Sequence, residues 1–171
     1  LSVLWRDKQI EYTRLCSMSG HYRPFWDLTR AGLRFAAQRL GLPLDAAGED
    51  RLMNQYRHLS AFPENREVLQ ALKQRVIPAG ILSNGDPEML GVAVKSAGFS
   101  GLLAHVISVH PLRRYKTDPA VYALGPQALE EGGVEGAADP LADVAGGDVD
   151  GDVDRPAVGA ALAVGAGVGV A

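Results

Sequence analysis

Apolar residues recur at helical spacing over three stretches before the chain first resembles a strand. The first stripe ends at Gly20, the second runs from about Pro24 to Gly41, and a weaker third carries Leu52, Tyr56 and Leu59. Side chains three and four positions apart share one face of a helix, so each stripe predicts an amphipathic helix. The apolar members of the first two stripes are Leu1, Leu4, Trp5, Tyr12, Leu15 and Met18, then Phe25, Leu28, Phe35, Ala36 and Leu40. Three successive helices predict a helical module over residues 1–61.

The pattern changes at Pro63, where helices begin to alternate with short apolar runs. A helix from Pro63 is followed by a predicted strand over residues 77–82, a helix, a second predicted strand over residues 106–109 and a final helix after Asp118. Asp86 and Pro87 have the residue types of a helix start, with Asp86 as the N-cap. Alternating helices and strands with short connections predict a parallel sheet of doubly wound type. Residues 62–131 are therefore expected to form part of an α/β core.

Residues 132–171 differ from both parts because they contain almost only Gly, Ala, Val and Asp. A low-complexity composition of this kind predicts no packed structure. All four residue types are encoded by triplets that begin with G, so we hypothesise that the segment is a shifted reading frame of a GC-rich gene, or mistranslated sequence, and not an evolved domain. The hypothesis fails if neither of the other two frames continues a strand-and-helix pattern.

Charge and composition exclude several classes of function. Only Arg155 among the 17 Lys and Arg residues lies beyond Leu129, and the remaining basic residues are scattered. They lack the aromatic-interleaved basic stripe of a nucleic-acid-binding protein. Cys16 is the single cysteine, which excludes a disulfide framework and favours a reducing, cytoplasmic setting. The apolar stretch at residues 157–171 is too short and too rich in Gly for a membrane span.

No pattern of metal ligands is present in the sequence. The four histidines, His21, His58, His105 and His110, show neither HxxH nor HExxH spacing, so a zinc site is not expected. The aspartates of "GDVDGDVD" lack the glycine and the glutamate that an EF-hand calcium loop requires.

Three positions are candidates for binding an anion. Ser83 and Asn84 follow the first predicted strand, where loop amides and a helix N-terminus favour negative charge, but a polar turn explains the same residues equally well. Lys116 follows the next strand and could reach the same edge, although most lysines are simply solvated. Arg6 adjoins the apolar stripe of the first helix, where packing or surface exposure is the commoner role.

The segments "LWRDKQIEYTRL", "ILSNGDP" and "YKTDPAVY" together resemble the L-2-haloacid dehalogenases, the type II group of the haloacid dehalogenase-like superfamily. The resemblance covers residues 1–129. It implies a Rossmann-like α/β core, of which the parallel sheet is incomplete here, with an inserted helical cap subdomain. It also implies a small 2-haloacid substrate, a released halide, no metal or other cofactor, and a family in which homodimers are common.

The resemblance also assigns roles to polar residues. Arg6 matches the arginine that receives the halide, and Ser83 and Asn84 match the pair that binds the substrate carboxylate. Lys116 matches the lysine that stabilises the nucleophilic carboxylate, with Tyr122 beside it. A small haloalkanoate needs such a cationic cradle and polar clamps.

Two apolar residues are implied to form the wall for the alkyl group of the substrate, namely Ile10 and Phe25. In the resembled family an aspartate displaces the halide from carbon 2 and water hydrolyses the resulting ester, which gives an inverted 2-hydroxy acid.

The chain departs from the family pattern in several places. The nucleophilic aspartate belongs to a D-x-x-G-T segment that would precede Leu1, and the Ser-Asn pair of the fourth motif is absent after Leu129. His110 stands where an aspartate is usual, and Thr117 where a proline is usual. The sequence therefore predicts a fragment that is inactive as written. Alternatives are a magnesium-dependent phosphatase of the same superfamily and a non-catalytic fragment.

Overall fold

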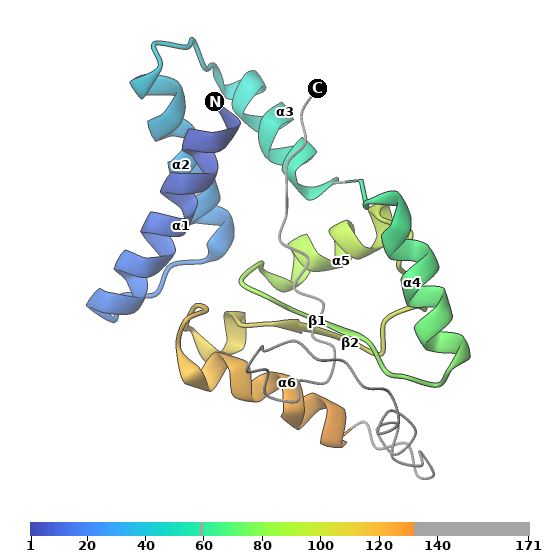
Figure 1. Ribbon diagram of the computed structural model, residues 1–171. Coiled ribbons are helices and arrows are strands. Elements are labelled where there is room, and N and C mark those ends of the chain that lie inside the picture. The colour runs from blue at the N-terminus through green and yellow to red at the C-terminus, as the bar shows by residue number, and fades with distance from the viewer. Residues whose placement is uncertain (59, 132–171) are drawn as a thin grey trace, which may run out of the picture.

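The computed structural model describes residues 1–58 and 60–131 and shows a mixed α/β arrangement (Figure 1). Three helices come first: α1 (Ser2–Ser19), α2 (Phe25–Arg39) and α3 (Ala46–Arg57). We call them the helical unit. The elements α4 (Pro63–Gln74), β1 (Gly80–Ser83), α5 (Pro87–Ser96), β2 (His105–Ser108), a short 3-10 turn (His110–Leu112) and α6 (Pro119–Glu131) follow, and we call them the α/β unit. The predicted tail, residues 132–171, lies outside the described residues.

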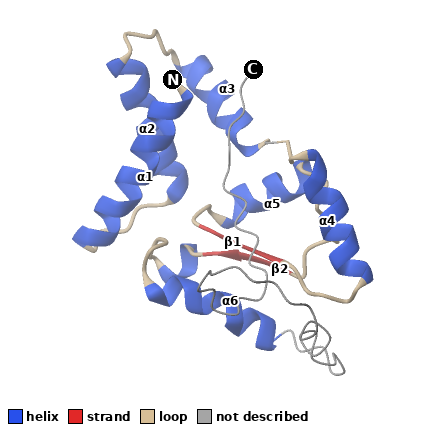
Figure 2. Ribbon diagram, viewed as in Figure 1, coloured by secondary structure: helices blue, strands red, loops and turns tan. Residues whose placement is uncertain are grey.

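The two strands pair in parallel, with Gly80 opposite His105 and Ser83 opposite Ser108. Helices α4 and α5 lie over one face of this sheet and α6 over the other (Figure 2). Parallel strands need crossover connections, and α5 supplies the one between β1 and β2. The predicted alternation of helix and strand is confirmed, and the carboxyl ends of both strands meet at one edge.

The boundaries of the helices follow local signals. Gly20 and Gly41 adopt left-handed backbone angles, with φ of 71° and 65°, within two residues of the ends of the first two helices. A residue with a Cβ is strained in this region, which explains why glycine ends both stripes. The first strand, however, begins at Gly80 and not at residue 77. Ile77 still donates its backbone N–H to Leu72 O of the preceding helix, and Pro78 lacks the N–H that a strand ladder needs.

Two apolar clusters hold the α/β unit together. Leu69, Ala79 and Phe99 bury the contact between α4, β1 and the end of α5. The other cluster contains Leu28 with Val109, Tyr115 and Val121. Because Leu28 belongs to α2, this second cluster joins the helical unit to the α/β unit.

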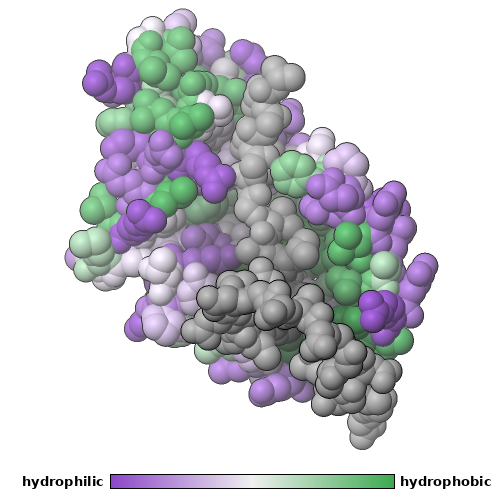
Figure 3. All heavy atoms as spheres, in the orientation of Figure 1, coloured by the Kyte–Doolittle hydropathy of each residue, from purple (hydrophilic) through white to green (hydrophobic). Residues whose placement is uncertain are grey.

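The helical unit also has buried residues of its own, including Leu33, Ala36 and Met53, each at most 1% exposed. Apolar residues are also visible on the surface, over the helical unit and near α4 (Figure 3), and the exposed large side chains there include Val3, Leu40 and Val68. Among the described helices, none combines the length and the apolar character needed to cross a bilayer.

Candidate functional site

The carboxyl ends of β1 and β2 form a hydrogen-bonded rim. Val109 N donates to Ser83 O at 3.1 Å. The Ser108 hydroxyl donates to Gly85 O at 2.7 Å and accepts from His110 N at 3.1 Å. These bonds fix the loop after each strand to the last residue of the other strand, so the polar residues of both loops have defined positions.

The side-chain oxygens of Ser83 and Asn84 both accept hydrogen bonds from backbone amides of neighbouring loops. The Ser83 hydroxyl oxygen accepts from Gly85 N at 3.1 Å, and Asn84 Oδ1 accepts from Lys116 N at 2.9 Å. Within residues 1–58 and 60–131, neither the Ser83 hydroxyl proton nor Asn84 Nδ2 has a hydrogen-bond partner. The polar turn and the anion site are therefore compatible, because the acceptors build the turn while two neighbouring donors remain available for a ligand.

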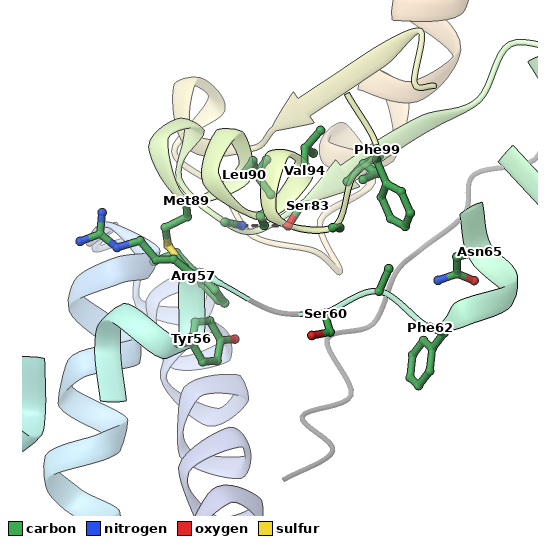
Figure 4. A pocket seen from close by; sticks show the side chains of 16 residues that line it. Tyr56, Arg57, Ser60, Phe62, Asn65, Ser83, Met89, Leu90, Val94 and Phe99 are labelled. Carbon is green, nitrogen blue, oxygen red and sulfur yellow. Dashed lines mark hydrogen bonds between the residues drawn. The ribbon is translucent and has the colours of Figure 1, made fainter. Parts of the chain in front are cut away.

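A cavity of about 140 Å³ opens beside Ser83. Most of its wall is apolar and comes from α5 and the segment before α4, including Met89, Leu90 and Phe62, which Figure 4 shows around it. Phe25 of the helical unit completes the wall. An apolar cavity with a few polar groups at one edge is typical of a small-molecule site.

Lys116 lies at the same rim, and its backbone is bound to Asn84. Burial lowers the pKa of the Lys116 ammonium, because desolvation disfavours the charged form. Tyr122 is different: its side chain is 52% exposed on α6, and no hydrogen bond joins it to Lys116 in the described part of the chain. The structure thus brings Ser83, Asn84 and Lys116 together and leaves Tyr122 at the surface.

Arg6 and Ile10 lie on α1, and neither lines the cavity. Arg6 does lie close enough to Tyr56, a cavity residue, for its charge to act on the phenol. Burial raises the pKa of the Tyr56 hydroxyl, while a hydrogen bond with Gln9 and the charge of Arg6 oppose that rise. The predicted halide arginine is therefore close to Tyr56, which lines the cavity, but does not itself line it.

Tyr56 was expected only as a member of an apolar stripe. Its hydroxyl donates to Gln9 Oε1 at 3.1 Å, and Gln9 Nε2 donates to the Thr29 hydroxyl at 2.6 Å. Gln9 is 5% exposed and Thr29 is fully buried. Gln9 precedes Tyr56 by 47 residues, so no local sequence signal could identify this buried network.

Asp86 corrects another expectation. It occupies the N-cap position of α5, as predicted, but its side chain makes no hydrogen bond to that helix. The carboxylate instead accepts from the backbone amides of Phe25 and Trp26 in α2.

Among the described residues, no group of three or more His, Cys, Asp or Glu side chains is arranged to hold a metal ion.

Comparison with known proteins links this chain to one family. Residues 8–138 match the haloacid dehalogenase-like hydrolase family. The chain is 42% identical over 129 residues to the (S)-2-haloacid dehalogenase of Pseudomonas sp. (strain YL). These residues make up 75% of this chain and 56% of that protein. The chain is 40% identical over 129 residues to the haloacetate dehalogenase H-2 of Moraxella sp. (strain B), covering 75% and 58%.

Solved structures give the same result. A crystal structure of an L-2-haloacid dehalogenase is 58% identical and superposes with a TM-score of 0.72 over 74% of this chain and 58% of that one. The L-2-haloacid dehalogenase of Xanthobacter autotrophicus with chloropropionic acid covalently bound is 35% identical, with a TM-score of 0.68 over 74% and 51%. The chain therefore spans a little over half the length of the curated relatives described above.

Proposed function

The chain belongs to the haloacid dehalogenase-like hydrolase family, and from this premise we propose that its site binds a short 2-haloalkanoate as part of an (S)-2-haloacid dehalogenase. The observation that carries the proposal is the pair of hydrogen-bond donors on Ser83 and Asn84, which have no partner among the described residues, together with the position of Ser83 in the wall of an apolar cavity. Two donors suit the two oxygens of a carboxylate. The apolar wall beside them suits the alkyl group.

In this proposal the helical unit acts as a cap over the α/β core. Arg6 receives the departing halide, and Ile10 and Phe25 form the wall for the alkyl group. The effect of the Arg6 charge on Tyr56 supports this placement, since Tyr56 lines the cavity. Phe25 has the most direct support, because it lines the cavity together with Ser83.

Lys116 is proposed to stabilise a carboxylate nucleophile at the rim. The bond between its backbone and Asn84 supports a position close to the substrate carboxylate. A half-buried ammonium also interacts more strongly with an anion than an exposed one does, because the local dielectric is lower. The side chain of Tyr122 is proposed to assist Lys116, although the exposure of Tyr122 lends this role less support.

The reaction consists of two displacements. A carboxylate oxygen of an aspartate attacks carbon 2 of the substrate, a C–O bond forms, and the halide leaves with the electron pair of the C–halogen bond. Water then attacks the ester carbonyl, the bond between the carbonyl carbon and the substrate oxygen breaks, and that oxygen takes up a proton from the water, which releases a D-2-hydroxy acid and restores the aspartate carboxylate. The 171 residues contain no D-x-x-G-T segment, so we propose that this chain supplies the binding side of the site and releases no halide by itself.

Two assays on the 171-residue chain test the proposal. Titration with L-2-chloropropionate, followed by NMR, is expected to shift the backbone amides of Ser83, Asn84 and Lys116. Ser83→Ala and Asn84→Ala should each weaken binding by about 10-fold, because each removes a charge-assisted hydrogen bond of roughly 1.5 kcal/mol. Ser19→Ala is the matched control, since Ser19 is exposed at the end of α1 and does not line the cavity.

The same samples are tested for release of chloride. Turnover above a blank without protein would contradict the expected inactivity of the chain, and absence of specific shifts at the rim would refute the carboxylate site. In a full-length version that carries the nucleophilic aspartate, magnesium-dependent hydrolysis of p-nitrophenyl phosphate, with no response to chloropropionate, would instead support the phosphatase alternative.

A further inference from the structure

Helix α2 begins without a capping side chain of its own. Its N-cap residue is Pro24, which has no side-chain acceptor for the amides of the first turn. Asp86 supplies that acceptor from the other unit. Its two carboxylate oxygens accept from Phe25 N at 3.3 Å and from Trp26 N at 2.8 Å. A carboxylate is favoured at a helix N-terminus by both the unpaired N–H groups and the helix dipole.

Neighbouring side chains hold this carboxylate in place. His110 Nδ1 lies 2.9 Å from Asp86 Oδ1 and 2.9 Å from the hydroxyl oxygen of Tyr22. The ring of Tyr22 stacks on Tyr115 with a centroid separation of 5.3 Å. The side chain of Asp86 is only 13% exposed. Asp86 is therefore fixed from both the loop before α2 and the loop after β2.

The position of Asp86 connects two parts of the cavity. Its neighbour in sequence, Gly85, lines the cavity with Ser83, and Phe25, whose amide it binds, lines the same cavity from α2. A change in the contact between Asp86 and α2 would therefore alter the distance between the aromatic wall and the polar rim.

We propose that Asp86 is a positioning residue that caps α2 across the two units and, through Phe25, sets the size of the alkyl group accepted beside the carboxylate site. The role in selectivity rests on the proposed function, whereas the capping role does not. Asp86 touches no substrate in this proposal and acts only through α2.

Amide hydrogen exchange tests the capping role in the full chain. Asp86→Asn preserves the shape of the side chain but places an amide nitrogen among the donors Phe25 N, Trp26 N and His110. We expect exchange in the first turn of α2 to accelerate by about 5-fold or more, as for the loss of a helix cap of roughly 1 kcal/mol. Asp45→Asn is the matched control, because Asp45 accepts from Gly48 N at 2.7 Å and caps only its own helix, α3.

Unchanged exchange in the first turn of α2 in the Asp86→Asn chain overturns the capping role. Acceleration confined to that turn, with Asp45→Asn affecting only α3, supports it. If Asp86→Asn does not fold, Tyr22→Phe provides a second variant. It removes only the hydroxyl that contacts His110, and a smaller acceleration at the same amides is expected.

Ligand selectivity tests the role of Phe25. Chloroacetate and L-2-chloropropionate differ by one methyl group, which an apolar pocket distinguishes by about 10-fold or more. Asp86→Asn should move the ratio of the two dissociation constants toward one by about 3-fold, and Asp45→Asn should leave it unchanged. Equal weakening of both ligands overturns the selectivity role. If neither acid binds the unsubstituted chain, the proposed function and the selectivity role both fail, while the exchange result still decides whether Asp86 caps α2.

Discussion

Gly32 allows α1 and α2 to pack closely, and its replacement gives a sharp test of that contact. A Cβ at this position would lie 3.2 Å from Trp5 O, 3.3 Å from Gln9 N and 3.3 Å from Trp5 Cδ1. Two of these atoms belong to the backbone of α1. The Trp5 ring is also held, because its Nε1 donates to Thr29 O at 2.7 Å and its ring lies 5.4 Å from that of Tyr56.

Two opposing effects determine the result of Gly32→Ala. Replacing a glycine inside a helix by alanine gains about 0.5–1 kcal/mol, because the unfolded chain loses conformational freedom. Overpacking a closely packed contact costs about 1–3 kcal/mol. The cost exceeds the gain where backbone atoms must separate, so we expect the free energy of unfolding to fall by roughly 1 kcal/mol.

Gly91→Ala is the matched control, since Gly91 lies inside α5 and a Cβ there would meet no atom within 4 Å. Only the favourable effect applies, and the variant should be more stable by about 0.5–1 kcal/mol. Urea unfolding followed by circular dichroism measures both variants, with equal slopes as evidence of the same unfolding transition. A Gly32→Ala chain as stable as Gly91→Ala would refute the close approach of α1 and α2.

Three further changes test other contacts. Glu49→Gln should lower the free energy of unfolding by about 1–3 kcal/mol. The hydrogen bond from Arg34 holds the pKa of the Glu49 carboxyl below its usual value. In a series of unfolding experiments at different pH, the loss of stability should therefore be full above about pH 5 and shrink as the pH falls through the lowered pKa. Tyr115→Phe removes the hydroxyl that donates to Arg23 O, and an unfolding experiment should show a loss of about 1–3 kcal/mol; unchanged stability would argue against that bond. Direct NMR titration of the Lys116 ammonium should give a midpoint below the ordinary value of about 10.4, because burial disfavours its charge; a midpoint at or above that value would contradict its burial.

The helices were predictable because their signals are local. The stripes and the glycines that end them act within one or two turns, and Gly20 and Gly41 have the left-handed angles that this role requires. The strands were less well defined. The apolar run from Ile77 to Leu82 contains Pro78, whose missing N–H delays the first strand to Gly80.

Part of the site was predictable from a topological rule. Ser83 ends the first of two parallel strands and Lys116 follows the second, so both lie at one edge of the sheet, and Lys116 N donates to Asn84 Oδ1. The resemblance to L-2-haloacid dehalogenases, which rested on the segments around these residues, is confirmed by the comparisons. The roles of all the proposed site residues remain predictions. Ser83 and Phe25 line the cavity, whereas the other members do not, namely Arg6, Ile10, Asn84, Lys116 and Tyr122.

Asp86 shows why the remainder could not be predicted. An aspartate followed by proline at the start of a helix satisfies the local rule for an N-cap, and the rule identifies the correct helix boundary. It does not identify which amides the carboxylate binds, because those of Phe25 and Trp26 lie some 60 residues earlier. Pro24 leaves the start of α2 without a side-chain acceptor. The free N–H groups at such a helix start are stabilised when they donate to a nearby carboxylate. Asp86, which the local sequence assigns to the start of α5, thus caps α2 instead. Only the three-dimensional structure, which brings the start of α2 next to Asp86, reveals this.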